Sequence, residues 1–235
     1  MKQYKSAIMV AGLVLIVGVC AYFKFATSSV QTLGLSTTSK VIVIDPGHGG
    51  YDPGKVGIKG SHEKDINLAI ALKLKDYLEE SGAKVVMTRT QDEDLDGLPD
   101  KFNKNSDMRT RKEIINGSGA DILISIHQNA FTQPEVRGAQ VFYYNESNNA
   151  KVLARNVQTS ITENADANNK RKIKSTENYY VLKVSTMPGI IIECGFLTNP
   201  EEESALNSEG YQDKMAWSIY AGIVKYFQQV EGGQS

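Results

Sequence analysis

Two short aliphatic runs constrain the fold of this chain most strongly. VIVI at residues 41–44 and GIII at residues 189–192 lack the polar residue at every second position that a strand with one wet face would show. Runs of this kind are typical of strands that helices cover on both faces. Because helical and strand patterns alternate along the chain, we predict an α/β fold. The expected form is a single domain with a mostly parallel or mixed central sheet flanked by helices.

The remaining expected elements follow from periodicity and turn residues. Strands are expected at residues 40–45, 84–90, 121–127, 138–144 and 189–193, with a further short one at 179–184. Helices are expected at residues 65–80, 109–116, 148–164 and 211–229. Residues 91–107 are polar and rich in Asp, Asn and Gly, so we expect a surface loop there.

The first 25 residues differ in composition from the rest. Two lysines precede an apolar run at residues 7–23, and residues 26–39 are rich in Ser and Thr. This pattern predicts a signal peptide or an N-terminal membrane anchor at 1–25, a linker at 26–39 and one folded domain at 40–230. The run, about 17 residues long, favours the anchor. Either form places the domain outside the cytoplasm.

Net charge and cysteine content exclude some classes of protein. The formal net charge of −1 gives no reason to expect a nucleic-acid partner. Cys20 lies in the apolar run and Cys194 in the domain, so no intramolecular disulfide is expected. We expect Cys194 to be a small buried hydrophobic residue.

Two of the three histidines stand where an expected strand ends. His48 follows VIVID after Pro-Gly, and His127 ends DILISIH. Open α/β sheets bind ligands at the carboxyl ends of their strands, so one metal ion can bring the two together. Catalytic zinc commonly takes two histidines and one carboxylate and leaves its fourth position to water. Glu63, Asp52 and Asp65 are all candidates for the carboxylate, and spacing does not separate them.

Hydrolysis also needs a base that is not bound to the metal. Glu193 directly follows the aliphatic run GIII, where a buried carboxylate costs several kcal/mol, roughly, unless it is paired. An ordinary ion pair is one interpretation, but beside two histidines we favour a catalytic base. His62 is left outside the expected ligands, with a solvent-facing or substrate-contacting role.

Four segments in order resemble those of the zinc-dependent N-acetylmuramoyl-L-alanine amidases of the amidase-3 family. They are VIVIDPGHGG with His48, EKDINL with Glu63, SIHQNA with His127 and GIIIECGFLTNPEEE with Glu193. The resemblance implies one Zn²⁺ per chain, held by His48, Glu63 and His127. It also selects Glu63 as the third ligand and implies Glu193 as the catalytic residue.

The resemblance further implies the reaction. Its substrate is peptidoglycan, and the bond cleaved is the amide between N-acetylmuramic acid and the L-alanine of the stem peptide. Zinc polarises the carbonyl, and Glu193 moves a proton from water to the leaving amine. Asp45, Asn129 and Arg111 are candidates for supporting the ligands or binding substrate.

The small size of the domain restricts the resemblance to one group within the family. Repeated wall-binding modules are not expected, and residues 145–178 leave little room for the autoinhibitory helix of some division amidases. This form most resembles the spore-cortex amidases of endospore formers, which prepare muramic acid for conversion to muramic δ-lactam. The expected location is extracytoplasmic, in the forespore or spore envelope. A membrane-surface or lipoprotein partner that aids zinc or substrate binding is also expected.

Two other functions are alternatives to this amidase activity. One is a zinc peptidase or deacetylase that acts elsewhere on peptidoglycan. The other is an anchored wall-binding protein with a structural metal, which four protein ligands would close. Cys194 is the one cysteine of the expected domain that such a site could use.

Overall fold

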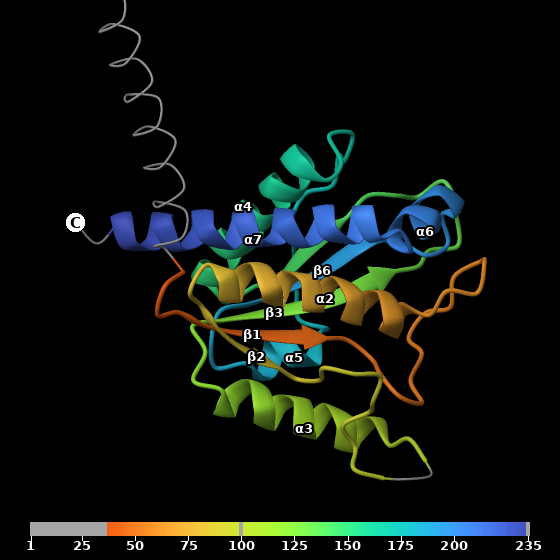
Figure 1. Cartoon of the computed structure of the whole chain (residues 1–235), viewed down its shortest axis with the longest axis horizontal. Coiled ribbons are helices and arrows are strands. Elements are labelled where there is room, and N and C mark those ends of the chain that lie inside the picture. The colour runs from red at the N-terminus through yellow and green to blue at the C-terminus, as the bar shows by residue number, and fades with distance from the viewer. Residues whose placement is uncertain (1–36, 99–100, 234–235) are drawn as a thin grey trace, which may run out of the picture.

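The sheet that organises the domain is mixed. The computed structural model describes residues 37–98 and 101–233, and their strands form one six-stranded sheet in the order β2-β1-β3-β6-β4-β5 (Figure 1). The strands are β1 (Val41–Pro46), β2 (Lys84–Met87), β3 (Ile122–Asn129), β4 (Gln140–Tyr144), β5 (Lys174–Thr176) and β6 (Gly189–Phe196). β4 runs antiparallel to β6, and the other neighbouring strands are parallel. The predicted α/β fold with a mixed sheet is confirmed.

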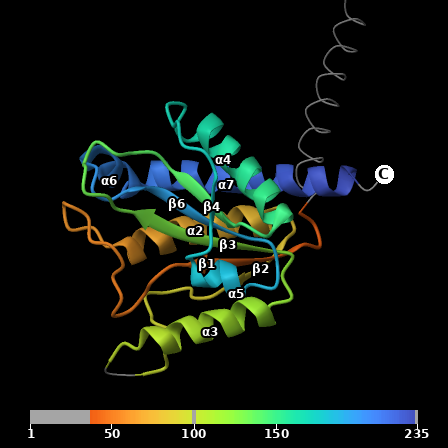
Figure 2. The ribbon, with the colours of Figure 1, turned by 180° about the vertical axis from the view of Figure 1, so that it is seen from behind.

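Helices cover both faces of this sheet (Figures 1 and 2). They are α2 (Glu63–Glu80), α3 (Lys104–Gly117), α4 (Asn148–Asn164), α5 (Tyr180–Val184), α6 (Pro200–Leu206) and α7 (Glu209–Gly232). The larger apolar cluster joins α2, α4 and α7 to one face of the sheet. A smaller cluster joins α3 and α5 to the other face.

The aliphatic runs divide their side chains between these two clusters. Ile42 and Ile44 of β1 belong to the larger cluster, whereas Val43 between them belongs to the smaller one. In β6, Ile190 and Ile192 face the larger cluster in the same way. Burial on both faces therefore explains why these strands contain no alternating polar positions.

The smaller cluster does not extend to the carboxyl ends of the strands. On the same face, β1 continues into Asp45, β3 into Ser125 and His127, and β6 into Glu193. The register pairs Asp45 with Ser125 and His127 with Glu193, so these residues lie side by side. The fold thus collects polar side chains at the carboxyl edge of one face, beyond the cover of α3 and α5.

The strand predicted at residues 179–184 is wrong, because α5 occupies this segment. Val181 and Leu182 are adjacent in sequence, and both are buried in the same cluster. A strand would send neighbouring side chains to opposite faces, whereas one helical turn places both against the sheet. β5, which was not predicted, takes the place beside β4.

Other boundaries also differ. The helix expected at 109–116 begins at Lys104, because the Asn103 side chain accepts hydrogen bonds from the amides of Asn105 and Ser106 and caps it. The expected loop at 91–107 is correspondingly shorter. α6 was not predicted, although Asn199 caps it and Pro200 is its first residue, a typical start for a helix.

The expected membrane segment at residues 1–25, and most of the linker, lie outside the described residues. Among the residues that are described, no helix is long and apolar enough to cross a membrane.

Candidate metal centre

Three side chains converge at the carboxyl edge of the sheet. One ligand atom from each of His48, Glu63 and His127 lies within 4.8 Å of the others. Glu63 Oε1 is 3.3 Å from His48 Nε2 and 2.9 Å from His127 Nδ1. Two imidazoles and one carboxylate are the donor set of many catalytic zinc sites, so the residues present fit this metal.

A strained backbone presents His48. Its φ of 62° lies in the left-handed region, which a non-glycine residue adopts at a cost of about 1–3 kcal/mol. Two buried arginines hold this loop. Arg111 donates to the carbonyls of Pro46 and His48, and Arg89 donates to those of Pro46 and Gly47.

Asp52 supports the His48 ring. Its Oδ2 lies 2.7 Å from His48 Nδ1, so Nε2 is the nitrogen that faces Glu63. A carboxylate on the second ring nitrogen fixes the orientation of a metal-binding histidine. Burial lowers the pKa of His48, but the hydrogen bonds and charges of Asp52 and Glu63 outweigh it and raise the pKa to about 9.

Glu63 is the first residue of α2 and is almost fully buried. Its Oε2 accepts a hydrogen bond from Lys55 N at 2.7 Å, and its Oε1 accepts one from Gln128 N at 3.1 Å. Burial alone would raise the pKa of this carboxyl group, but His127 and His48 hold it well below the usual range. Glu63 is therefore ionised and directs Oε1 at both imidazoles.

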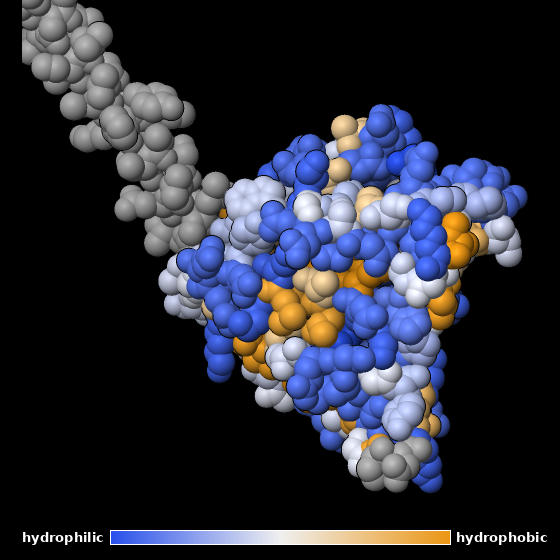
Figure 3. All heavy atoms as spheres, turned by 45° about the vertical axis from the view of Figure 1, so that its right-hand side comes forward, coloured by the Kyte–Doolittle hydropathy of each residue, from blue (hydrophilic) through white to orange (hydrophobic). Residues whose placement is uncertain are grey.

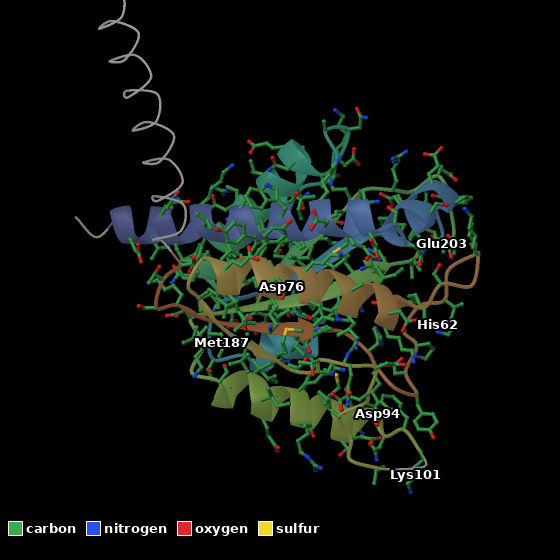
Figure 4. The ribbon with its side chains drawn as sticks, viewed as in Figure 1. His62, Asp76, Asp94, Lys101, Met187 and Glu203 are labelled. Atoms are coloured by element: carbon green, nitrogen blue, oxygen red, sulfur yellow. The ribbon has the colours of Figure 1, made fainter. Side chains whose placement is uncertain are left out.

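The loop before α2 is fixed from the opposite side. Glu203 of α6 is fully buried, and its carboxylate accepts hydrogen bonds from the Lys59 and Ser61 amides and from the Ser61 hydroxyl. Figure 4 shows Glu203 close to the start of α2, where His62 is labelled. α6 thus holds in place the loop whose Lys55 amide binds Glu63.

Gly47 leaves room for the second histidine. A Cβ at this position would lie 2.1 Å from Cε1 of His127 and 2.3 Å from its Nε2. The glycine is required here because no larger residue permits the imidazole to occupy its observed place.

Glu193 stands next to His127 and is only 6% exposed. Its Oε1 accepts a hydrogen bond from the Tyr179 hydroxyl at 2.9 Å, whereas its Oε2 has no hydrogen-bond partner in the part of the chain that the structure describes. Burial raises the pKa of Glu193, and the nearby Glu63 charge adds to the increase, while His127 opposes it. A raised pKa makes this carboxylate a stronger base than an ordinary exposed glutamate.

Asp45, Arg111 and Asn129, the candidates for supporting roles, lie in different parts of the site. Asp45 and Arg111 form a buried ion pair at 2.7 Å, and Thr88 and Ser125 also donate to Asp45. Burial raises the pKa of Asp45, but Arg111 and His127 hold it below its usual range. The buried pair of Asp45 and Arg111 thus supports the loop that carries His48. Asn129 lines the cleft, and a role in substrate binding stays a prediction.

Several residues that were considered for the site lie outside the cluster of His48, Glu63 and His127. Asp65 and His62 are exposed at the start of α2, and their closest ring nitrogen and carboxylate oxygen are 3.8 Å apart. Cys194 is buried in the larger apolar cluster, as expected, on the face opposite to Glu193. Among the described residues, no fourth His, Cys or acidic ligand joins His48, Glu63 and His127.

Several contributing residues were not predicted in these roles. Tyr179 and Arg89 carry no local sequence signal, because each acts on a segment distant in the chain. Glu203 ends the segment GIIIECGFLTNPEEE, but its hydrogen bonds to the loop before α2 were not predicted. Asp52 was considered only as a metal ligand. Its position four residues after His48 is the one signal that could have indicated support of the ring.

The cluster opens into a cleft of about 770 Å³. Its walls include Asp52, Lys55, Met108, Asn129 and Tyr179. Figure 3 turns the side on which the strands end toward the viewer, and most of the surface there is hydrophilic. A cleft of this size accommodates a ligand of several sugar or amino-acid units.

The fold and the site define a candidate metal-dependent hydrolase, with three ligands and a separate buried carboxylate. The family described as N-acetylmuramoyl-L-alanine amidase matches residues 42–225. This match spans most of the chain, and the chain belongs to that family.

Individual proteins to which the chain is similar are also amidases. The chain is 39% identical to the germination-specific N-acetylmuramoyl-L-alanine amidase of Bacillus subtilis, over 97% of both chains. It is 32% identical to the amidase AmiA of Escherichia coli, over 80% of this chain and 76% of that one. A solved structure of the CwlD amidase from Clostridioides difficile in complex with the GerS lipoprotein superimposes with a TM-score of 0.78. That structure is 41% identical and covers 81% of this chain and all of its own.

Proposed function

We propose that this chain is a zinc-dependent N-acetylmuramoyl-L-alanine amidase of the spore cortex, with His48, Glu63 and His127 as zinc ligands and Glu193 as the catalytic base. The observation that carries the proposal is the convergence of these four residues at one cleft. It is supported by 39% identity to a germination-specific amidase along nearly the whole chain.

The metal would supply two parts of this chemistry. When bound by the three ligands, zinc supplies a Lewis acid for the amide carbonyl and makes water more acidic. The ionised Glu63 offsets part of the charge of the metal. Asp52 keeps Nε2 of His48 directed to the metal, through its contact with Nδ1.

Glu193 carries the proton. It removes a proton from the attacking water, and it returns the proton to the amide nitrogen as the C–N bond breaks. The products are a free L-alanine amino group on the stem peptide and a carboxyl group on the lactyl arm of muramic acid. Burial of Glu193 raises its pKa, which makes the carboxylate a stronger base for the uptake of the proton.

Glu193→Gln tests the base. The substitution keeps the size of the side chain, and we expect the release of stem peptide from purified peptidoglycan to fall by about 10²–10⁴-fold. Zinc content should remain that of the unsubstituted chain. Glu209→Gln, a substitution of an exposed glutamate at the start of α7, is the matched control. Unchanged release by the Glu193 variant would overturn the assignment of the base.

The reaction products separate this activity from its alternatives. Mass spectrometry of digested cortex should show muramic acid without peptide, whereas a deacetylase leaves the peptide attached. A peptidase would cut within the stem and leave L-alanine on the lactyl arm.

We also propose an extracytoplasmic location and a lipoprotein partner that aids zinc or substrate binding. The solved CwlD amidase is in complex with a lipoprotein, which supports this proposal. The purified chain alone is then expected to hold less than one zinc per chain or to digest cortex slowly. Full zinc content and full rate without a partner would contradict the proposal.

A further inference from the structure

The two oxygens of Glu193 have different surroundings. Oε1 accepts a hydrogen bond from the Tyr179 hydroxyl at 2.9 Å. Oε2 is buried and has no hydrogen-bond partner among the described residues. A buried carboxylate oxygen without a donor is costly, and such atoms often mark a functional site.

Tyr179 is held firmly where its hydroxyl meets Glu193. It lies immediately before α5, and its carbonyl accepts a hydrogen bond from Lys183 N at 3.1 Å. Its ring meets that of Phe142 edge to face, with centroids 5.5 Å apart. Val181 and Leu182 then bury α5 against the sheet. The hydroxyl therefore comes from a packed aromatic side chain with few alternative positions.

We propose that Tyr179 is a positioning residue for the reaction: its hydroxyl, bonded to Oε1, holds the Glu193 carboxylate in the orientation in which it accepts and returns the proton. This inference rests on the proposed function, because it assigns a positioning residue to the proposed base. Orientation of the base is what the geometry supports, since a single hydrogen bond to one oxygen fixes the rotation of the carboxylate.

The proton balance of the step is simple. An O–H bond of the attacking water breaks, and an O–H bond to the Glu193 carboxylate forms. That bond later breaks as an N–H bond forms on the leaving amine and the amide C–N bond is lost. The Tyr179 O–H bond stays intact throughout. Burial and the nearby Glu193 charge raise the pKa of Tyr179, so its hydroxyl remains a donor at neutral pH.

Tyr179→Phe in the full chain tests the inference. The substitution keeps the ring that packs on Phe142 and removes only the hydroxyl. We expect kcat to fall by about tenfold or more, since hydrogen bonds to charged groups are worth this much. KM, zinc content and the melting temperature should stay within about twofold or a few degrees of the unsubstituted values, as for a change confined to orientation.

Tyr144→Phe is the matched control. Tyr144 packs against the same apolar cluster as Tyr179, and its substitution also removes one hydroxyl, without touching Glu193. We expect its kcat to be unchanged. A Tyr179→Phe kcat that falls less than about fivefold overturns the inference. A loss confined to KM overturns it too, because the hydroxyl would then bind substrate.

The same assay with Glu193→Gln keeps this inference distinct from the proposed function. If Glu193→Gln is inactive and Tyr179→Phe is fully active, the base assignment stands and the positioning role fails. If Glu193→Gln is itself fully active, the proposed function fails at the base, whatever Tyr179→Phe does.

Discussion

His48 is held between two carboxylates, and this sets the behaviour of the metal-free protein. Asp52 lies at its Nδ1 and Glu63 at its Nε2, and together they raise the pKa of the ring to about 9 against the effect of burial. The charged imidazole is thus the stable form at neutral pH until a metal replaces its proton. The stability that this charge contributes is fully present below an unfolded pKa of about 6.5 and is lost as pH rises through about 9.

Zinc binding should therefore release a proton from His48. We expect the apparent zinc affinity to rise about tenfold per pH unit between pH 6 and 8, the slope for one released proton. Competition with a chelator at several pH values measures it. Asp52→Asn, which removes one of the two carboxylates, should flatten the slope. A pH-independent affinity would contradict the protonated state of His48.

Gly47→Ala tests the space reserved for His127. The added methyl group would lie 2.1 Å from the imidazole, so the ring must move away. We expect zinc affinity to fall by about 10–100-fold, as for lost supports of metal ligands. Gly117→Ala meets no atom within 4 Å and is the control. Equal zinc affinity in both variants would show that the ring has another position available.

The residues that meet in the cluster could be predicted because each belongs to a motif or ends a strand. His48 and His127 follow from strand ends alone, whereas Glu63 was one of three acids until the family pattern selected it. The roles of Tyr179 and Glu203 could not be found in this way, although Glu203 ends one of the four motifs. Their partners lie 14 and 142 or more residues away along the chain, and only the folded backbone brings them together.

At the scale of elements, α4 and α7 approach each other closely at one glycine. A Cβ on Gly222 would lie 2.6 Å from Val157 Cα, which is backbone and cannot move aside. We expect Gly222→Ala to lower the free energy of unfolding by about 1–3 kcal/mol through overpacking. Urea denaturation measures it.

Gly210→Ala provides the control within the same helix. Its Cβ meets nothing within 4 Å, so we expect a gain of about 0.5–1 kcal/mol from helix propensity. If Gly222→Ala were equally stabilising, the close packing of α4 on α7 would be disproved.

The long helices could be predicted, whereas α5, α6 and β5 could not. The helix expected at 148–164 matches α4, since an apolar stripe of several turns identifies it. α5 and β5 have five and three residues, too few for a period to emerge. The aromatic and β-branched residues of 179–184 favour a strand by propensity, and burial of Val181 beside Leu182 overrides it.

At the scale of the whole molecule, the site is separate from the apolar cores. Neither cluster of buried hydrophobic residues contains a proposed ligand. Chelation should therefore abolish activity while leaving the far-ultraviolet circular dichroism and a single cooperative thermal transition intact, with the melting temperature lowered. Added zinc should restore activity. Unfolding on chelation would instead indicate a structural metal.

The point at which the described chain begins lies far from the cleft. Thr37 bonds to Ser81, which ends α2, whereas Glu63 begins that helix at the site. The 18 residues of α2 span about 27 Å. If the residues before Thr37 hold the enzyme to a bilayer, the body of the domain acts as a spacer. The active site then lies at the end of the domain that is farther from the bilayer. There it faces glycan strands one domain length above the lipid.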